Sequence, residues 1–272
     1  MKIIFNKYEG AGNDFVILKN SPSVIDHADA LLIRKLCDRH FGIGADGLML
    51  IEECDGYDFR MNFFNSDGSR GAMCGNGARC ASHFAMRNIT GFRNLTFLAD
   101  DGPHAARPAG DGIIEVSFPD VKKVIFAPDG ILINTGVPHL VVFTEDNSKT
   151  DMVTFGRTLR WSQAYAPDGV NVNLVSIRDG KLNVRTYERG VEDETLACGT
   201  GITASAIAAA YTGKIVTSET EVTARGGQVS VRFTLEENGA RDIYLTGPAT
   251  FVFSGETEIL PASDLDNPEY RI

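Results

Sequence analysis

The feature of this sequence that most restricts its fold is a short motif that occurs once in each half of the chain. The two copies are Cys74-Gly75-Asn76-Gly77-Ala78-Arg79 and Cys198-Gly199-Thr200-Gly201-Ile202-Thr203. In both copies a strand-like segment and a Gly-containing turn precede the cysteine, and a run of small residues typical of a buried helix follows it. The repeated unit spans residues 57–86 and 181–211. We therefore expect two similar domains, each built around one helix that begins at its cysteine.

The hydrophobic pattern predicts the same elements around both motifs. Strands are expected at 2–8, 15–18, 48–52, 57–65, 170–177, 182–187 and across 220–254. Helices are expected at 26–40, from just after Cys74 to 88, at 153–161, and from Cys198 to a C-capping Gly213. The predicted class is α+β, with two pseudo-symmetric domains that are antiparallel, β-rich and barrel-like. Their expected bounds are 1–118 and 119–249, and the segment 250–272, a loose tail from Glu256, can return to the first domain.

Composition excludes several classes of protein. The formal net charge is −10, which argues against a nucleic-acid partner because phosphate binding needs a basic surface. No apolar run approaches the ~20 residues of a membrane span. The N-terminus turns polar too early for a secretory signal, so we expect a cytoplasmic protein without a membrane partner.

The five cysteines form no Cys-x-x-Cys pair and no zinc-like spacing with histidine, so no metal is expected and the thiols should be free. Cys37, Cys54 and Cys80 fit apolar patterns and are expected in the core.

A cysteine at a helix start is placed for proton transfer. Unpaired backbone N–H groups and the positive end of the helix dipole favour the thiolate, so the pKa of Cys74 and Cys198 can fall below its usual range. The same N–H groups bind carboxylates, and the following glycines allow a ligand to come close. Two such sites facing each other would hold an α-amino acid between two thiols. One thiolate would remove the α-proton and the other thiol would protonate the opposite face, without a cofactor.

Three segments resemble the diaminopimelate epimerase family. They are Lys7-Tyr8-Glu9-Gly10-Ala11-Gly12-Asn13-Asp14-Phe15, the first motif with Phe64-Asn65-Ser66-Asp67-Gly68 before it, and Tyr187-Glu188-Arg189-Gly190 with Glu194-Thr195-Leu196-Ala197 before the second motif. The resemblance runs from residue 2 to about 254. It implies the diaminopimelate-epimerase-like fold, Cys74 and Cys198 as the acid–base pair, and interconversion of LL- and meso-diaminopimelate for lysine and peptidoglycan synthesis. It also implies a homodimer.

The resemblance assigns roles to further residues. Ligands of the distal end of the substrate would be Asn13, Asn65, Asn171 and Arg189. Donors to the reacting end would be Gly75, Asn76, Gly199 and Thr200. His139 and Glu188 would set the protonation of the cysteines, and Glu188 would also contact the substrate. Two positions depart from the pattern: some members carry Gln at the position of Gly47, and many carry Asn at that of Val137.

Three other functions are compatible with parts of the pattern. A related two-thiol racemase could act on proline or hydroxyproline, although those enzymes tend to carry His at the position of Asn76. A thiol redox protein could use Cys74 and Cys198 as a dithiol, but this leaves the paired Gly-x-Gly helix starts unexplained. A non-catalytic anion-binding module would need no cysteine at either helix. Which thiol is the base for which stereoisomer is open at this stage.

Overall fold

The computed structural model describes residues 2–71 and 73–258. In the first half the strands pair in the order β17 (Thr250–Glu258), β1 (Lys2–Gly10), β2 (Asn13–Lys19), β3 (Gly47–Glu52), β4 (Phe59–Asn65), β5 (Leu95–Ala99), β6 (Gly102–Gly110) and β7 (Ile113–Phe118). In the second half the order is β8 (Val124–Ala127), β9 (Gly130–Asn134), β10 (Pro138–Phe143), β11 (Asn171–Arg178), β12 (Lys181–Glu188), β14 (Glu219–Ala224), β15 (Gly227–Leu235) and β16 (Ala240–Pro248). The two paths match strand for strand, so the internal repeat of the sequence is a repeat of the whole sheet. The short β13 (Asp193–Thr195) adds to β12 only.

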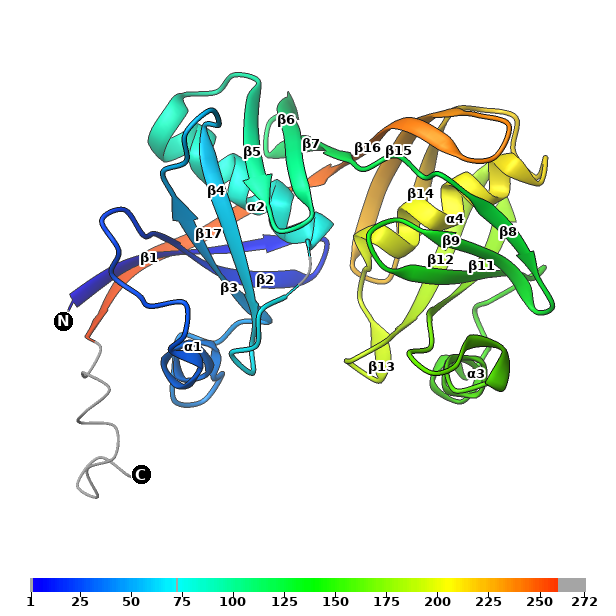
Figure 1. The fold of residues 1–272 in the computed structure, drawn as a ribbon, viewed down its shortest axis with the longest axis horizontal. Helices are drawn as coiled ribbons and strands as arrows, with labels where there is room; N and C mark the ends of the chain where they lie inside the picture. The colour runs from blue at the N-terminus through cyan, green and yellow to red at the C-terminus, as the bar shows by residue number, and fades with distance from the viewer. Residues whose placement is uncertain (1, 72, 259–272) are drawn as a thin grey trace.

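The two halves join at a seam where β7 and β16 pair antiparallel, from Ile113 with Pro248 to Phe118 with Ile243. The chain crosses into the second half after β7 and returns after β16, so that β17 pairs with β1. Figure 1 shows the two lobes side by side with this seam between them. The seam therefore lies where a pseudo-twofold axis would relate the halves.

Each half surrounds one helix and carries a second one outside. The inner helices α2 (Gly75–Ala85) and α4 (Gly199–Tyr211) are buried along almost their full length. They contribute Ala78 and Ala81 to one hydrophobic core, and Ile202 and Ile207 to another. The outer helices α1 (Ala30–Cys37) and α3 (Met152–Arg160) pack on smaller clusters of their own. Small side chains suit α2 and α4 because a sheet approaches them from several sides.

The predicted fold class is confirmed, with local differences. The sheets are mixed rather than antiparallel, because β2–β3, β4–β5, β10–β11 and β12–β14 are parallel pairs. All four pairs are connected through a helix, which carries the chain back to the starting end of the sheet. The helix α1 is shorter than 26–40, since Asp29 caps its start at the N–H of Leu32.

Of the other local predictions, some are confirmed and some need correction. The α-helix that follows Cys74 ends at Ala85, and a short π-helix, η1 (Met86–Thr90), follows it directly. Gly213 has a positive φ just after α4, as a C-cap requires. Cys37 and Cys80 are buried, but Cys54 lies half-buried after β3 and is not a core residue. Residues 256–258 belong to β17 rather than to a tail, and 259–272 lie outside the described residues.

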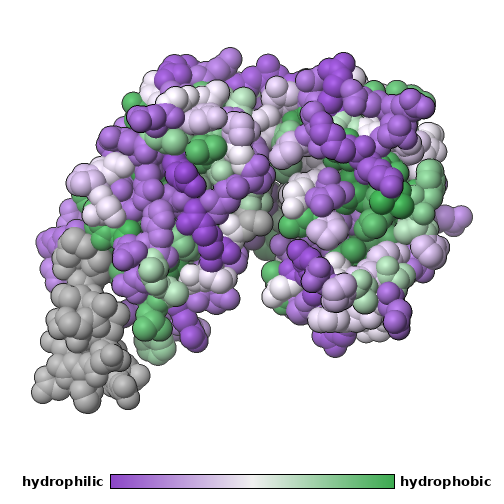
Figure 2. Space-filling view, viewed as in Figure 1, coloured by the Kyte–Doolittle hydropathy of each residue, from purple (hydrophilic) through white to green (hydrophobic). Residues whose placement is uncertain are grey.

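No helix in the described part of the chain is long and apolar enough to cross a membrane. The space-filling view shows a furrow between the two lobes, which touch along one side of the molecule (Figure 2). The starts of α2 and α4 lie at this seam, since Gly75 is beside Phe118 of β7 and Leu245 of β16, and Gly199 is beside Leu245.

Candidate active site

Cys74 and Cys198 occupy equivalent positions at the N-caps of α2 and α4. Their backbone angles are nearly identical, with φ −107° and ψ 114° for Cys74 and φ −110° and ψ 107° for Cys198. Each carbonyl accepts the first helical hydrogen bond, from Ala78 at 2.7 Å and from Ile202 at 2.8 Å. An extended residue followed by Gly-x-Gly therefore gives the same local structure twice. Neither cysteine side chain caps its own helix, so both sulfur atoms remain available.

The two helix starts meet directly. A Cβ placed on Gly199 would lie 3.2 Å from the Cα of Gly75, and one placed on either glycine would lie 3.1 Å from Leu245 in β16. The side-chain amide of Asn76 donates across the interface to the carbonyl of Ala197 at 2.9 Å. The structure thus brings the two predicted catalytic motifs together, although 121 positions separate Asn76 from Ala197.

Burial controls the protonation of both thiols. Burial and the charge of Glu188 raise the pKa of Cys74, whereas the backbone N–H groups of Gly77 and Asn76 lower it. The net pKa is about 11. Burial and Glu188 also raise the pKa of Cys198, against the hydroxyl of Thr200. The expected lowering of the thiol pKa is therefore wrong for this structure, because desolvation outweighs the helix N–H groups. A thiolate formed here is a strong base, which suits removal of a weakly acidic α-proton.

His139 lies in β10 with its side chain fully buried. Its Nδ1 is 3.1 Å from the side-chain nitrogen of Asn173, whose oxygen accepts a hydrogen bond from Thr186 at 2.9 Å. Because Asn173 must donate at this contact, Nδ1 of His139 is the acceptor and Nε2 carries the proton. Burial, with the charge of Arg189, lowers the pKa of His139 to about 3, so the imidazole is neutral near pH 7.

A chain of hydrogen bonds leads from His139 to Cys198. Nε2 of His139 is 2.9 Å from Oγ1 of Thr200, which is 3.3 Å from the sulfur of Cys198. With Nε2 as the donor, the Thr200 hydroxyl is free to donate to the sulfur. The backbone carbonyl of Thr200 in turn accepts from the hydroxyl of Thr135 at 2.9 Å. His139, which was predicted to set the protonation of the cysteines, thus reaches Cys198 through Thr200.

Glu188 ends β12 and is the acidic group whose charge acts on both thiols. Burial raises the pKa of Glu188 itself. A carboxylate beside two buried thiols discourages a second negative charge. It therefore favours a state in which at most one thiol is ionised.

The residues predicted to bind the distal end of the substrate are only partly joined by contacts. Asn171 accepts from the backbone N–H of Arg189 at 2.7 Å and approaches His139 at 3.5 Å. Asn13 accepts from Asn76 at 2.6 Å. Asn65 lies at the end of β4, is exposed, and bonds to Ser69. No contact among the described residues links Asn65 to the other predicted ligands, so the structure leaves it apart from the rest of the predicted site.

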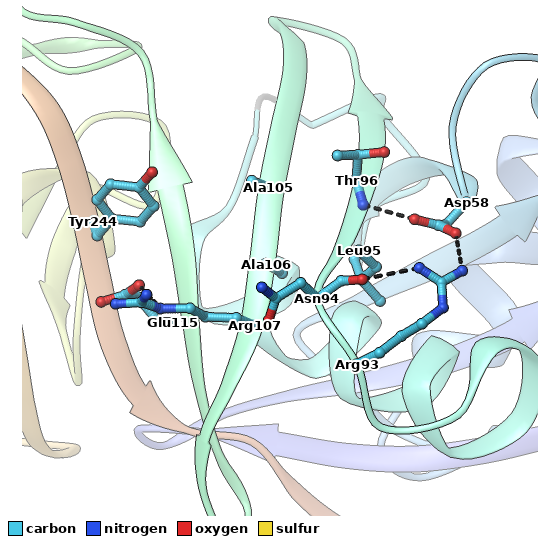
Figure 3. A pocket seen from close by; sticks show the side chains of 10 residues that line it. All are labelled: Asp58, Arg93, Asn94, Leu95, Thr96, Ala105, Ala106, Arg107, Glu115 and Tyr244. Atoms are coloured by element: carbon cyan, nitrogen blue, oxygen red, sulfur yellow. Dashed lines mark hydrogen bonds and ion pairs between the residues drawn. The ribbon is translucent and has the colours of Figure 1, made fainter.

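A cavity elsewhere on the molecule lacks this chemistry. It measures about 410 Å³ and is lined by β5, β6 and β7 with Tyr244 of β16 (Figure 3). Its charged groups already pair with one another, Arg93 with Asp58 and Arg107 with Glu115. Neither cysteine lines it, so the helix starts remain the candidate active site.

Comparison with known proteins identifies the family of this chain. The sequence profile of the family described as diaminopimelate epimerase matches residues 5–116 and 131–252. The chain belongs to this family. It is 43% identical over 248 residues to the diaminopimelate epimerase of Flavobacterium psychrophilum, covering 91% of this chain and 97% of that protein. It is 39% identical over 271 residues to that of Aquifex aeolicus, covering 92% and 96%.

Solved structures show that the fold of the diaminopimelate epimerase family extends to other proteins. A phenazine biosynthesis protein of the PhzF family from Bacillus anthracis superposes with a TM-score of 0.70 at 16% identity, covering 95% of this chain and 100% of that chain. A hydroxyproline epimerase from Agrobacterium vitis gives 0.67 at 14% identity, covering 94% and 91%. At these identities the likeness concerns the fold alone.

The departure from the family pattern at Gly47 has a steric cause. A Cβ at Gly47 would lie 2.5 Å from the ring of Phe63 and 2.6 Å from the carbonyl of Phe64. The ring of Phe63, which packs edge-on against Phe15, therefore occupies the space that a larger residue at position 47 would need. Val137 precedes β10, and its carbonyl accepts from the N–H of Thr135.

Sequence reasoning missed two residues that shape the site of this family member. Asn173 fixes the tautomer of His139. It lies two residues after Asn171 on the same strand, so the spacing Asn-x-Asn placed both amides on one face and could have identified it. Arg79 is fully buried behind the start of α2. An arginine in a helix of small residues was the available signal.

Proposed function

We propose that this protein is a pyridoxal-phosphate-independent isomerase that interconverts LL- and meso-2,6-diaminopimelate. The observation that carries the proposal is the meeting of two equivalent helix starts, each with a cysteine at its N-cap. The names of the relatives, which cover most of this chain, support the choice of substrate.

The site supports a two-base reaction. The N–H groups at Gly75, Asn76, Gly199 and Thr200 converge from two helices and suit the α-carboxylate. One thiolate takes the α-proton and becomes a thiol, while the opposite thiol gives its proton to the other face and becomes a thiolate. The carbanion between these steps is stabilised because fixed N–H donors surround its carboxylate in a site shielded from water.

The distal end of the substrate would select it from ordinary amino acids. We propose that Arg189 binds the distal carboxylate and that Asn13, Asn65 and Asn171 complete this end. An amino acid without a second zwitterionic centre would leave these groups unpaired, which is costly in a closed site. Replacement of Arg189 by Ala should therefore raise KM for diaminopimelate more than tenfold, whereas the exposed Arg178→Ala should not change it.

Four further statements are part of the proposal. The enzyme would serve lysine and peptidoglycan synthesis, act in the cytoplasm, use no cofactor and form a homodimer, as the resemblance implies. We also propose domain bounds of 1–118, with the segment from 250 returning to it, and 119–249. The return of β17 to β1 supports this division. Light scattering of the purified protein tests the dimer.

Isotope exchange tests the reaction. The reduced protein is incubated with LL-diaminopimelate in deuterated buffer without pyridoxal phosphate, and the α-proton is followed by NMR. Loss of this signal with appearance of the meso form is expected for the wild type. Neither is expected for Cys74→Ala or Cys198→Ala. The matched control is Cys54→Ala, which removes a thiol outside the site and should remain active.

The same assay separates the alternatives. Exchange with proline or hydroxyproline but not with diaminopimelate would favour a related two-thiol racemase. Absence of exchange with all of these substrates would contradict the two-base reaction. Binding of diaminopimelate that survives loss of both thiols, without any exchange in the wild type, would identify a binding module instead.

A further inference from the structure

Arg79 is an arginine in an unusual environment. Its side chain has no exposed surface. Its guanidinium donates to the carbonyls of Pro248 at 3.1 Å and Gly75 at 3.3 Å, and to the side-chain oxygen of Asn76 at 3.0 Å. All three acceptors are neutral, and the structure records no ion pair for Arg79 among residues 2–71 and 73–258. Buried cations are normally paired with carboxylates because desolvation is costly. An unpaired buried cation therefore calls for a functional explanation.

The internal repeat shows what Arg79 adds. Thr203 occupies the equivalent position in the second motif, and its hydroxyl donates to the carbonyl of Gly199 at 2.9 Å. Arg79 makes the corresponding contact with Gly75. A hydroxyl is thus enough to satisfy this carbonyl, and the positive charge is present at one helix start only.

Arg79 also fixes the side chain that ties the two motifs. Because Asn76 accepts from Arg79 through its oxygen, its amide nitrogen must point the other way. That nitrogen donates to Asn13 at 2.6 Å and to the carbonyl of Ala197 at 2.9 Å. Ala197 immediately precedes Cys198, so Arg79 acts through Asn76 on the relative position of the two cysteines.

Because Arg79 is present at the start of α2 only, the charges around the two thiols are unequal. Glu188 disfavours the thiolate at both cysteines. The charge of Arg79 favours the thiolate at Cys74, and Glu9 and Cys80 are the other ionisable groups near the guanidinium. Cys198 has the neutral Thr200 and His139 beside it instead.

We propose that Arg79 is a positioning residue that makes the two thiols unequal, so that Cys74 is the first of the pair to ionise. The proposal deepens the two-thiol reaction and rests on it. From this form, Cys74 as thiolate takes the α-proton and Cys198 as thiol gives one, which leaves Cys74 protonated and Cys198 ionised. The proton then moves from Cys74 to Cys198 through solvent to restore the starting form.

Alkylation of the full-length protein tests this without substrate. Iodoacetamide is added at pH values that span both thiol midpoints, and the modification of each cysteine is followed by peptide mass spectrometry. The rate at a cysteine depends on its fraction of thiolate and on the exposure of its sulfur, and Cys74 is more exposed than Cys198, so the midpoints of the two pH profiles are compared. In the wild type, the midpoint of Cys74 should lie at a lower pH than that of Cys198. Arg79→Gln should slow Cys74 about tenfold or more, corresponding to one pKa unit or more, with a smaller effect on Cys198. Arg79→Lys, which keeps the charge, should retain most of the rate.

The control variant is Thr203→Val, which removes the equivalent contact in the other motif and should leave the rate of Cys74 unchanged. Cys54 serves as an internal standard for reagent in every sample. The proposal is wrong if the midpoint of Cys198 lies at a lower pH than that of Cys74 in the wild type, or if Arg79→Lys and a folded Arg79→Gln slow Cys74 equally. If circular dichroism shows that Arg79→Gln does not fold, the order of the two midpoints in the wild type decides. Isotope exchange, measured separately, shows whether the epimerase function itself fails.

Discussion

Gly75 and Gly199 face each other at the point where α2 and α4 begin, so closely that a methyl group on Gly199 would lie 3.2 Å from the Cα of Gly75. This contact sets the separation of the two cysteine motifs. Because each glycine directly follows a cysteine, any displacement of one helix start moves a sulfur atom relative to the other.

Replacement of Gly199 by Ala should therefore impair catalysis more than folding. The added methyl group meets Gly75 and, at 3.1 Å, Leu245, so the two helices must separate by a few tenths of an ångström. We expect kcat to fall by about 10- to 100-fold and the free energy of unfolding to fall by about 1–2 kcal/mol. Steady-state kinetics and urea unfolding measure both.

The control for this change is Gly110→Ala. A methyl group there would contact Ile113 at 3.5 Å, which is an ordinary van der Waals distance. Gly110 is the last residue of β6 and belongs to neither motif. Its kcat should equal that of the wild type. A Gly199→Ala variant with kcat within twofold of the wild type would show that the close contact of the helix starts is not needed.

Oxidation should inactivate the protein by joining Cys74 to Cys198. The two thiols are close enough for the charge of Cys74 to raise the pKa of Cys198. The helix starts that carry them are in contact, so a small movement can bring the sulfur atoms to bonding distance. We expect activity to disappear with a mild oxidant and return with dithiothreitol. Peptide mass spectrometry should detect a disulfide between the two motifs. Inactivation without that peptide would refute the prediction, and Cys54→Ala should be as sensitive as the wild type.

The sequence predicted the part of the site that depends on local structure. Cys-Gly-x-Gly before a run of small residues specifies an extended residue and a buried helix, and Cys74 and Cys198 adopt this geometry. The repeat of the motif predicted the repeat of the fold. Parallel strand pairs such as β2–β3 escaped prediction, because alternation of side chains along a strand carries no information on the direction of its neighbour.

What the sequence could not predict depends on desolvation and on contacts between distant segments. The N–H groups at a helix start were expected to lower the thiol pKa, but burial by both lobes outweighs them at Cys74. The fixed tautomer of His139 depends on Asn173 and Thr186, which lie on neighbouring strands. The neutral acceptors around Arg79 come from its own helix and from Pro248. Such contacts are set by the folded sheet rather than by local sequence.

Replacement of Glu188 by Gln should change both thiols in the same direction. The charge of Glu188 raises the pKa of Cys74 and of Cys198, so the neutral amide should lower both and speed alkylation of each by several-fold. Epimerisation should still decline, because the resemblance also implies that Glu188 contacts the substrate. This pattern differs from that of Arg79→Gln, which should affect mainly Cys74. Unchanged alkylation of both cysteines would show that Glu188 does not act on them.

His139 should make the protein less stable in acid. Its pKa is about 3 in the folded protein, against an ordinary value of 6.5, so between these pH values the unfolded chain binds a proton that the folded protein does not. Stability is therefore lost as pH falls below about 6.5, by up to about 1.4 kcal/mol per pH unit. Between pH 7 and pH 5 the loss due to this residue is about 2 kcal/mol. Replacement by Gln should remove it.

Urea unfolding at pH 7 and pH 5 measures the effect as a difference between variants, which cancels the contributions of all other groups. His104 provides a control of opposite sign. Although burial lowers its pKa, hydrogen bonds with Asp101 and Ser117 raise the net value, so the folded protein binds this proton more tightly than the unfolded chain. Its contribution is present at low pH and lost as pH rises, and His104→Gln should therefore increase the loss of stability in acid. If His139→Gln and the wild type lose equal stability between pH 7 and pH 5, the imidazole is protonated in the folded state. The hydrogen-bond chain from Asn173 to Cys198 would then have to run with a charged histidine.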